Sequence, residues 1–307
     1  MGAAAAALGG CAGERPIADW PKVCIVRVPD YSQSIFETVR SLLAQFPLEV
    51  KGKTVVLKPN LVEFNPDAAI NTHPLLVHAA AEAFRALGAR VILAEGPGHR
   101  RVTLDLAESA GYLSAIPDFE RHFVDLNLDS VTRIDLPSPV SKLSSLYLPN
   151  TILAADLIVS MPKLKTHHWV GATLSMKNLF GVVPGGIYGW PKNILHWAGI
   201  EEAIVDLHRL FPRHFCLVDG ITAMEGNGPI QGTTRHAGVL VAGNDMVAVD
   251  ASCCRLMGID PAKIGYLRMA DSHGYLAGRN IRQIGESPES AATPFQLPPR
   301  LQFLRSN

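Results

Sequence analysis

Short apolar runs rich in β-branched residues recur along this chain and alternate with stretches whose apolar residues repeat at helical spacing. Ser32–Phe46 and Ala198–Leu210 are examples of the helical pattern. Strands separated by helices pack as parallel neighbours with the helices on the sheet faces. The alternation predicts an α/β fold of two Rossmann-like lobes with mainly parallel sheets. The strand-like runs are Val23–Val28, Thr54–Leu57, Val91–Ala94, Leu157–Met161, Phe215–Val218 and Val239–Ala242.

Most of these strand-like runs end at polar residues. In open α/β sheets, ligands bind outside the carboxyl ends of the strands. We therefore expect a cleft at that edge, lined by side chains from several strand ends. The polar residues at these ends are Lys58 and Asn60, Glu95 and His99, Lys163 and Lys165, Asp219, and Asp245.

The chain of 307 residues is long enough for one large domain or two of ordinary size. Prolines interrupt residues 111–150, and we place a boundary there. We expect an N-terminal α/β lobe over 21–135, a C-terminal lobe with the lysines and histidines over 136–286, and an irregular tail over 287–307. A formal net charge of zero argues against nucleic acid as the main partner. No apolar run reaches the roughly 18 residues of a transmembrane helix. The oligomeric state stays open.

The first 20 residues resemble the end of a secretory leader. Ala3–Ala7 precede Leu8-Gly9-Gly10-Cys11, where Cys11 stands in a lipobox-like position. A basic segment and a longer apolar core are missing, so the pattern predicts a truncated leader of the lipoprotein type, a lipid anchor at Cys11 and an extracytoplasmic protein. The alternative is a low-complexity tail on a cytoplasmic protein.

The segment Leu157–Ile200 holds four lysines, three histidines and no acid, although the composition would give about four acids in 44 residues. A field of one sign beside a buried strand end favours a small anionic ligand. Lys163 and Lys165 alternate along an extended segment and point the same way, as a phosphate or carboxylate clamp would require. The alternative is a basic surface loop.

Three residues are candidates for catalysis. His99 lies in a glycine-rich turn and could act as a general base near neutral pH. His167 and His168 cannot both face one pocket from an extended segment, and we expect His167 to point inward. Lys177 could contact an anion, form a Schiff base or hold a cofactor, because burial lowers the pKa of a lysine. A surface position for Lys177 is the alternative.

Cofactor-binding and metal-binding candidates surround these residues. His196 could bind a divalent metal through a neutral imidazole, and Asp219 and Asp245 could add oxygen ligands. The alternatives are a core histidine and two aspartates that cap turns. The predicted cofactor-binding set is Lys58, Asn60, Glu95, Gly96, Gly98, Lys163, Lys165, His168 and Asn178.

Several stretches spanning roughly residues 50–260 resemble the family catalogued as domain of unknown function 362. The resemblance predicts the fold, but it does not identify a reaction. Many relatives carry ferredoxin-like cysteine motifs that this chain lacks, which disfavours an iron–sulfur redox partner, and relatives often carry a twin-arginine leader. The matching stretches are Leu57–Asn60, Thr72–Pro74, Pro162–His168, Ser175–Gly181, Lys192–His196, Asp219–Pro229 and Asn244–Asp250.

A more distant resemblance is to the nickel-pincer-nucleotide lactate racemases. It lies in the order Gly98-His99-Arg100, His167, Lys177 and His196. The resemblance implies that His99 and His167 form an acid/base pair, that Lys177 anchors a nickel-pincer-like nucleotide and that His196 binds its metal.

These observations favour an enzyme that binds a small hydroxy or carboxy acid in a basic cleft and uses histidine acid/base chemistry, as a racemase, isomerase or oxidoreductase would. A metal or nucleotide cofactor is compatible with the same residues. The alternative is a non-catalytic extracytoplasmic lipoprotein that binds an anion in the same cleft.

Overall fold

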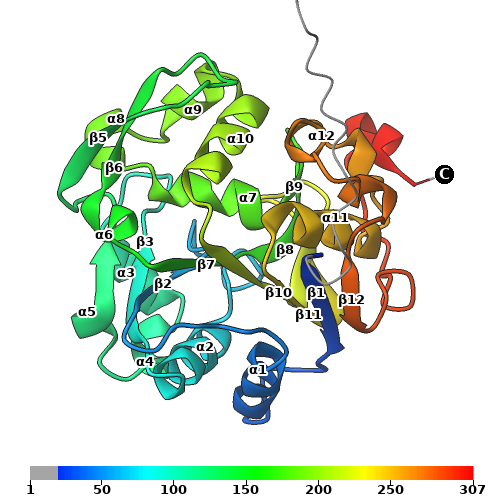
Figure 1. The fold of residues 1–307 in the computed structure, drawn as a ribbon, viewed down its shortest axis with the longest axis horizontal. Helices are drawn as coiled ribbons and strands as arrows, with labels where there is room; N and C mark the ends of the chain where they lie inside the picture. The colour runs from blue at the N-terminus through cyan, green and yellow to red at the C-terminus, as the bar shows by residue number, and fades with distance from the viewer. Residues whose placement is uncertain (1–19, 307) are drawn as a thin grey trace, which may run out of the picture.

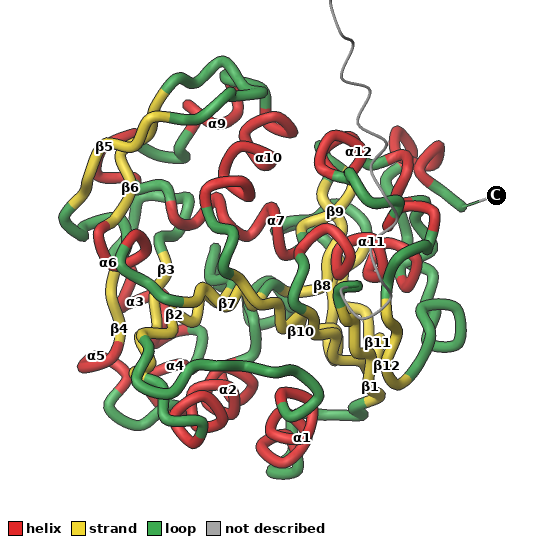
Figure 2. Tube along the Cα trace, in the orientation of Figure 1, coloured by secondary structure: helices red, strands yellow, loops and turns green. Residues whose placement is uncertain are grey.

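The computed structural model describes residues 20–306, and Cys11 and all but the last residue of the expected leader lie outside this part of the chain. The described strands build a ten-stranded sheet that runs through the middle of the molecule (Figures 1 and 2). Its main path has the order β12-β1-β11-β10-β7-β2-β3-β4. These strands are β1 (Lys22–Arg27), β2 (Thr54–Pro59), β3 (Arg90–Glu95), β4 (Phe123–Asp125), β7 (Leu157–Met161), β10 (His214–Glu225), β11 (Thr233–Gly243) and β12 (Arg282–Gly285).

The strands of the sheet are mainly parallel. Four neighbouring pairs, from β10 through β7, β2 and β3 to β4, are parallel, whereas β11 runs antiparallel to both β1 and β10. The expected α/β class with mainly parallel strands is confirmed. Strands from both expected lobes join one sheet, because β2 pairs directly with β7 from Val55 opposite Leu157 to Pro59 opposite Met161. The lobe boundaries stay predictions.

Two further strands extend the sheet where the candidate residues lie. β8 (Lys163–His167) pairs with β10 in parallel and with β9 (Gly171–Thr173) in antiparallel orientation. A separate hairpin is formed by β5 (Val131–Asp135) and β6 (Ser145–Pro149).

Helices cover both faces of the sheet (Figure 1). One face carries α1 (Ile35–Leu43), α2 (Pro74–Ala86), α4 (Tyr112–Ala115) and α5 (Phe119–His122), and α3 (Thr103–Ser109) precedes α4. The other face carries α7 (Ser175–Asn178), α10 (Ile200–Leu210), α11 (Met246–Leu256) and α12 (Gly265–Ala270). Short helices α6 (Asn150–Leu153), α8 (Gly185–Tyr188) and α9 (Asn193–Trp197) and the 3₁₀ turns η2 (Leu179–Val182), η3 (Pro261–Lys263), η4 (Tyr275–Ala277) and η5 (Pro299–Leu304) complete the described chain.

The alternation of side chains along each strand divides the core into two layers. Val55 and Leu57 of β2 pack with α1 and α2, whereas Val56 packs with the layer that contains α10 and α11. Each fully buried aliphatic side chain stabilises the fold by about 1.5–3 kcal/mol. The sheet is therefore held from both faces, and its strand ends form a rigid base for a site. No helix within residues 20–306 combines the length and apolar character needed to cross a membrane.

Candidate functional site

A small cavity of about 120 Å³ lies where β2, β3 and β8 end. Its lining contains four lysines and two histidines but one acid, which gives the cavity an excess of basic groups. The lining residues are Lys58, Asn60, Leu61, Val62, Glu95, Gly96, Gly98, Lys165, His167, Thr173, Lys177, Asn178, Phe180, Gly181, Pro191, Lys192, His196 and Pro229. We call it the inner cavity.

The single acid of the inner cavity is paired with one of its lysines. Lys58 Nζ lies 2.7 Å from Glu95 Oε2, and both side chains are buried. Lys58 also donates to the Asn178 side-chain oxygen at 3.1 Å, and the Asn178 amide donates back to the Lys58 carbonyl. Burial lowers the pKa of Lys58, and the Glu95 carboxylate opposes this shift. A Cβ on Gly181 would overlap Glu95 Oε1, so a glycine is needed for this close packing.

Lys165 and Lys192 are buried with main-chain carbonyls as their hydrogen-bond partners. Lys165 Nζ donates to the carbonyls of Ile70 at 2.9 Å and Pro229 at 3.2 Å. Lys192 Nζ donates to the carbonyl of Gly96 at 2.5 Å. Burial and the neighbouring lysines move the pKa of Lys165 well below its ordinary value. Burial, together with the charge of Lys58, lowers the pKa of Lys192 to about 7, although Glu95 opposes the shift.

Lys177 differs from the other lysines of the inner cavity. It lies in the last turn of α7, and its Nζ sits 3.6 Å from the centroid of the Phe180 ring. Its ammonium forms no hydrogen bond or ion pair with another residue in the described part of the chain. Burial lowers the pKa of Lys177 to about 7, and the charges of Lys58 and Lys192 contribute.

The position of α7 depends on a buried carboxylate of α11. Asp250 accepts hydrogen bonds from the main-chain N–H groups of Ser175 at 2.8 Å and Met176 at 3.0 Å. These are donors of the first helical turn, which have no partner inside the helix. Burial raises the pKa of Asp250 to about 7, and the two N–H groups oppose the shift. Asp250 therefore fixes the short helix from which Lys177 projects.

His167 and His196 also line the inner cavity, whereas His168 does not. His167 Nδ1 accepts the main-chain N–H of Trp169 at 3.0 Å, so in the neutral ring Nε2 carries the proton. Burial, reinforced by Lys177, moves the pKa of His167 well below its ordinary value. His168 Nδ1 lies 2.7 Å from the Gly228 carbonyl.

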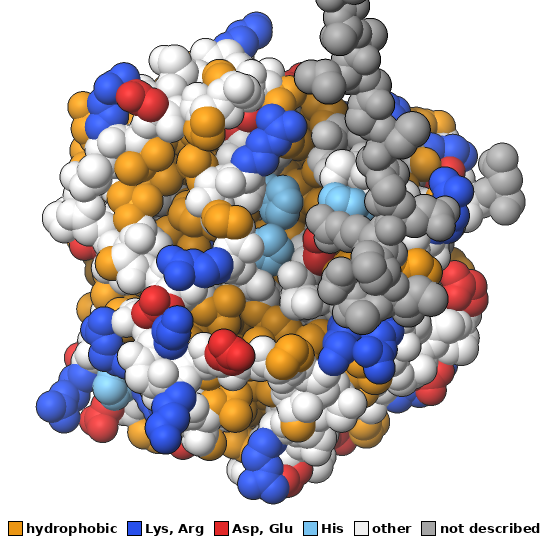
Figure 3. Space-filling view, in the orientation of Figure 1, with side chains coloured by type: hydrophobic (Ala, Val, Ile, Leu, Met, Phe, Trp, Pro, Cys, Tyr) orange, Lys and Arg blue, Asp and Glu red, His pale blue; other side chains and the backbone are white. Residues whose placement is uncertain are grey.

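A larger outer cavity of about 610 Å³ adjoins the inner one and shares lining residues with it, among them His167, Lys177 and His196. His99 and His168 line this outer cavity and are absent from the inner one. The indole of Trp169 is 61% exposed and stacks against His196 with ring centroids 5.5 Å apart. Figure 3 shows histidine side chains gathered near the middle of one face, with lysine or arginine side chains beside them.

Three buried polar atoms of residues that line the inner cavity have no hydrogen-bond partner within the described part of the chain. They are Asn60 Oδ1, Thr173 Oγ1 and His196 Nδ1. Leaving a buried polar group unsatisfied costs about 1–3 kcal/mol, and such groups in native proteins call for an explanation. A ligand with both hydrogen-bond donors and acceptors would satisfy them. Thr173, Phe180 and Lys192 all lie in the acid-free segment, but the sequence did not single them out as site residues.

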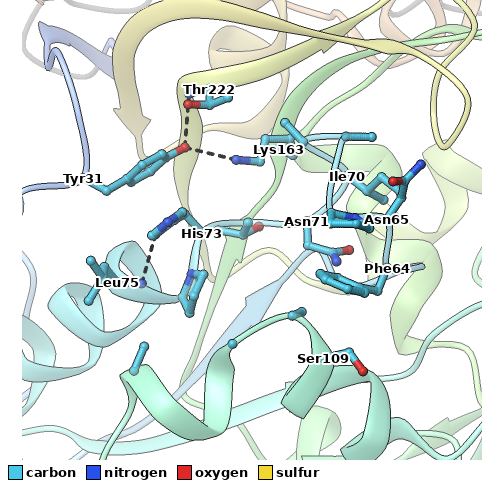
Figure 4. Close-up of a pocket in the computed structure, with 18 of the residues that line it drawn as sticks. Tyr31, Phe64, Asn65, Ile70, Asn71, His73, Leu75, Ser109, Lys163 and Thr222 are labelled. Atoms are coloured by element: carbon cyan, nitrogen blue, oxygen red, sulfur yellow. Dashed lines mark hydrogen bonds between the residues drawn. The ribbon is translucent and has the colours of Figure 1, made fainter.

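Lys163 lies in a different cavity, of about 1000 Å³, together with Tyr31 and His73 (Figure 4). Lys163 Nζ is 2.7 Å from Asp219 Oδ2 and 3.1 Å from the Tyr31 hydroxyl. Asp219 also accepts the Tyr31 hydroxyl at 2.7 Å. Tyr31 and His73 stack with ring centroids 3.7 Å apart, and no local sequence pattern predicts this contact. The expected clamp of Lys163 and Lys165 is therefore not formed, because Lys163 is neutralised by Asp219.

The structure does not bring His196, Asp219 and Asp245 together as metal ligands. Asp219 is paired with Lys163, and Asp245 caps α11 by accepting the N–H of Ala248 at 3.0 Å. Within residues 20–306, no group of three or more histidine, cysteine, aspartate or glutamate side chains is arranged to hold a metal ion. The nickel-pincer-like nucleotide implied by the distant resemblance stays a prediction.

The remaining predicted residues fall around the inner cavity. Lys58, Asn60, Glu95, Gly96, Gly98, Lys165 and Asn178 line it together with Lys177. Gly96 approaches the 179–182 turn so closely that a Cβ would lie 2.7 Å from the Gly181 carbonyl.

The chain is similar to solved structures and to a curated sequence relative. The chain is similar to the lactate racemase apoprotein from Thermoanaerobacterium thermosaccharolyticum, with a TM-score of 0.41 and 14% identity over 77% of this chain and 57% of that one. It is 30% identical over 222 residues to the "Thylakoid-associated protein sll1697" of Synechocystis sp.. That match covers 69% of this chain and 65% of the relative, so the chain spans somewhat less than two thirds of the relative's length. The model of the family described as domain of unknown function (DUF362) matches residues 55–255, and the chain belongs to this family.

Proposed function

We propose that the inner cavity is the binding site of an enzyme that acts on a small organic anion of the hydroxy-acid or carboxy-acid class. One observation carries this proposal. Lys165, Lys177 and Lys192 surround one cavity and have no carboxylate partner in the described chain, because Glu95 is paired with Lys58. A buried ammonium without a counter-charge is destabilising by several kcal/mol unless it loses its proton or meets an anion. A bound carboxylate supplies the missing charge.

The groups around the bound anion support acid/base chemistry. Lys177, with a pKa of about 7, accepts or donates a proton near neutral pH, which is where a general acid/base works best. Neutral His167 presents an Nε2–H donor to the same space. His99 would act on the part of a ligand that reaches the outer cavity. A protein that only captures an anion would use the same lysines, but an amine free of hydrogen-bond partners is better suited to a reaction.

We propose a location at a membrane surface from features other than the inner cavity. The expected leader over residues 1–20 and the expected lipid anchor at Cys11 stay predictions, because the structure describes only Trp20 of this stretch. The Synechocystis relative is described as thylakoid-associated, which supports a role for this chain at a membrane surface.

The test is binding of oxalate, a small unreactive dicarboxylate, measured by isothermal titration calorimetry. Lys165→Met should weaken oxalate binding by at least about tenfold, since a charge-assisted hydrogen bond contributes about 1.5–3 kcal/mol. Lys142→Met removes an exposed lysine and serves as the matched control. Failure of oxalate, lactate and inorganic phosphate to bind at millimolar concentration, or equal loss of affinity in both variants, would refute the proposal.

A further inference from the structure

Lys177 is the one lysine of the inner cavity whose amine is not held by polar partners in the described chain. Lys58 binds Glu95 and Asn178, and Lys165 and Lys192 each donate to two main-chain carbonyls. Such hydrogen bonds favour the protonated form of the nitrogen, which has no lone pair for a reaction. The Lys177 nitrogen instead lies over the Phe180 ring and lines both the inner and the outer cavity.

The surroundings of Lys177 favour its neutral form. The groups around it in the cavity include Lys58, Lys165, Lys192, His167 and His196, and none of these is negatively charged. The acid of this cavity, Glu95, is already bound to Lys58. An amine among cationic neighbours in a partly desolvated site is the usual form of an activated lysine nucleophile.

We propose that Lys177 attacks the carbonyl carbon of a 2-oxo acid and forms an imine with it. This inference rests on the proposed function, because the carboxylate of the oxo acid must be held by Lys165 and Lys192. In a 2-oxo acid the carbonyl is directly bonded to the carboxylate, so a small cavity can hold one group while presenting the other to Lys177. The Thr173 hydroxyl, which has no hydrogen-bond partner among the described residues, can donate a hydrogen bond to the same small molecule.

The reaction balances without an oxidant or a reductant. The lone pair of the neutral Lys177 nitrogen forms the C–N bond, and the carbonyl π electrons move to oxygen, which takes up a proton. Loss of a proton from nitrogen gives a carbinolamine. A second proton allows the hydroxyl to leave as water while the nitrogen lone pair forms the C=N bond. His196, whose Nδ1 has no hydrogen-bond partner in the structure, and His167 line the cavity and can carry these protons.

The experiment traps the imine on native full-length protein. The protein is incubated at pH 7 with pyruvate and sodium cyanoborohydride, digested and mapped by mass spectrometry. We expect a reduced pyruvate adduct on Lys177, dependent on both reagents and prevented by oxalate. With a pKa of about 7, half of Lys177 is neutral at pH 7, against roughly one in 2,500 for an ordinary lysine, so labelling should be more than about tenfold faster than at any exposed lysine.

Two variants, together with the map of pyruvate adducts on the wild-type protein, test the proposal. Lys177→Arg should lose the adduct and keep measurable oxalate binding, whereas Lys51→Arg, at an exposed position, should behave as wild type. If Lys177→Arg fails to fold, the position of the adduct in the wild-type protein still decides. Oxalate binding without a pyruvate adduct at Lys177, or adducts spread over exposed lysines, would overturn the imine and leave the anion site standing. Absence of both binding and adduct would overturn the two proposals together.

Discussion

At the scale of single residues, the sequence shows which groups are present but not which groups they meet. Lys163 and Lys165 stand two residues apart on β8, and their spacing predicts a shared role. Lys163 instead pairs with Asp219, while Lys165 donates to the main-chain carbonyls of Ile70 and Pro229. The difference comes from elements far away in sequence, namely β10 and the segment before α2. No local pattern records such a pairing.

The Lys58–Glu95 pair yields a prediction about stability. Lys58→Met should lower the free energy of unfolding by about 3–5 kcal/mol, because it leaves the buried Glu95 carboxylate without its counter-charge. Adding Glu95→Gln should recover much of this loss, since the double variant buries no charge. Urea denaturation at pH 7 measures both values. A Lys58→Met variant as stable as wild type would be inconsistent with this account. So would a double variant that loses more free energy of unfolding than the two single variants lose together.

At the scale of elements, strands with local apolar patterns were predicted well. The cores of β2, β3, β7 and β10 lie where the sequence places them, because buried β-branched runs are a local signal. Residues 111–150 gave no clear pattern, and they form short helices and a small hairpin. β8 was predicted only as an extended segment. Asp245, expected as a metal ligand, is a helix cap, and this alternative is common for aspartate before a helix.

Asp250 of α11 can be tested against a control on the same helix, its N-cap residue Asp245. Asp250→Ala removes the acceptor of two N–H groups of α7, so it should lower stability by about 2–4 kcal/mol and weaken oxalate binding through displacement of Lys177. Asp245→Ala removes an N-cap of the same helix and should cost about 1 kcal/mol with oxalate affinity unchanged. Thermal denaturation measures the stability of each variant, and calorimetric titration measures its affinity for oxalate. Equal effects of the two changes on oxalate affinity would contradict the role given to Asp250.

At the scale of the whole molecule, one continuous sheet brings the lysines together. β2 pairs with β7 on one side and β3 on the other, which places the ends at Lys58 and Glu95 beside the segment that leads to β8 and α7. The sequence predicts a site at the carboxyl edge of the sheet, and the inner cavity lies where β2, β3 and β8 end. The sequence could not show that the segment between β2 and α2 separates two cavities, because that division depends on packing across the sheet.

The central claim is that the lysines without a counter-charge around the inner cavity bind an anion, and proton uptake on binding tests it most directly. At pH 8, Lys177 and Lys192, each with a pKa of about 7, are mostly neutral in the free protein. A bound carboxylate favours their charged forms and raises these pKa values, so protons are taken up. Calorimetric titration of oxalate at pH 8 in buffers of different ionisation enthalpy measures the number of protons. We predict an uptake of about one or more protons per oxalate, and binding with no proton uptake would contradict the account.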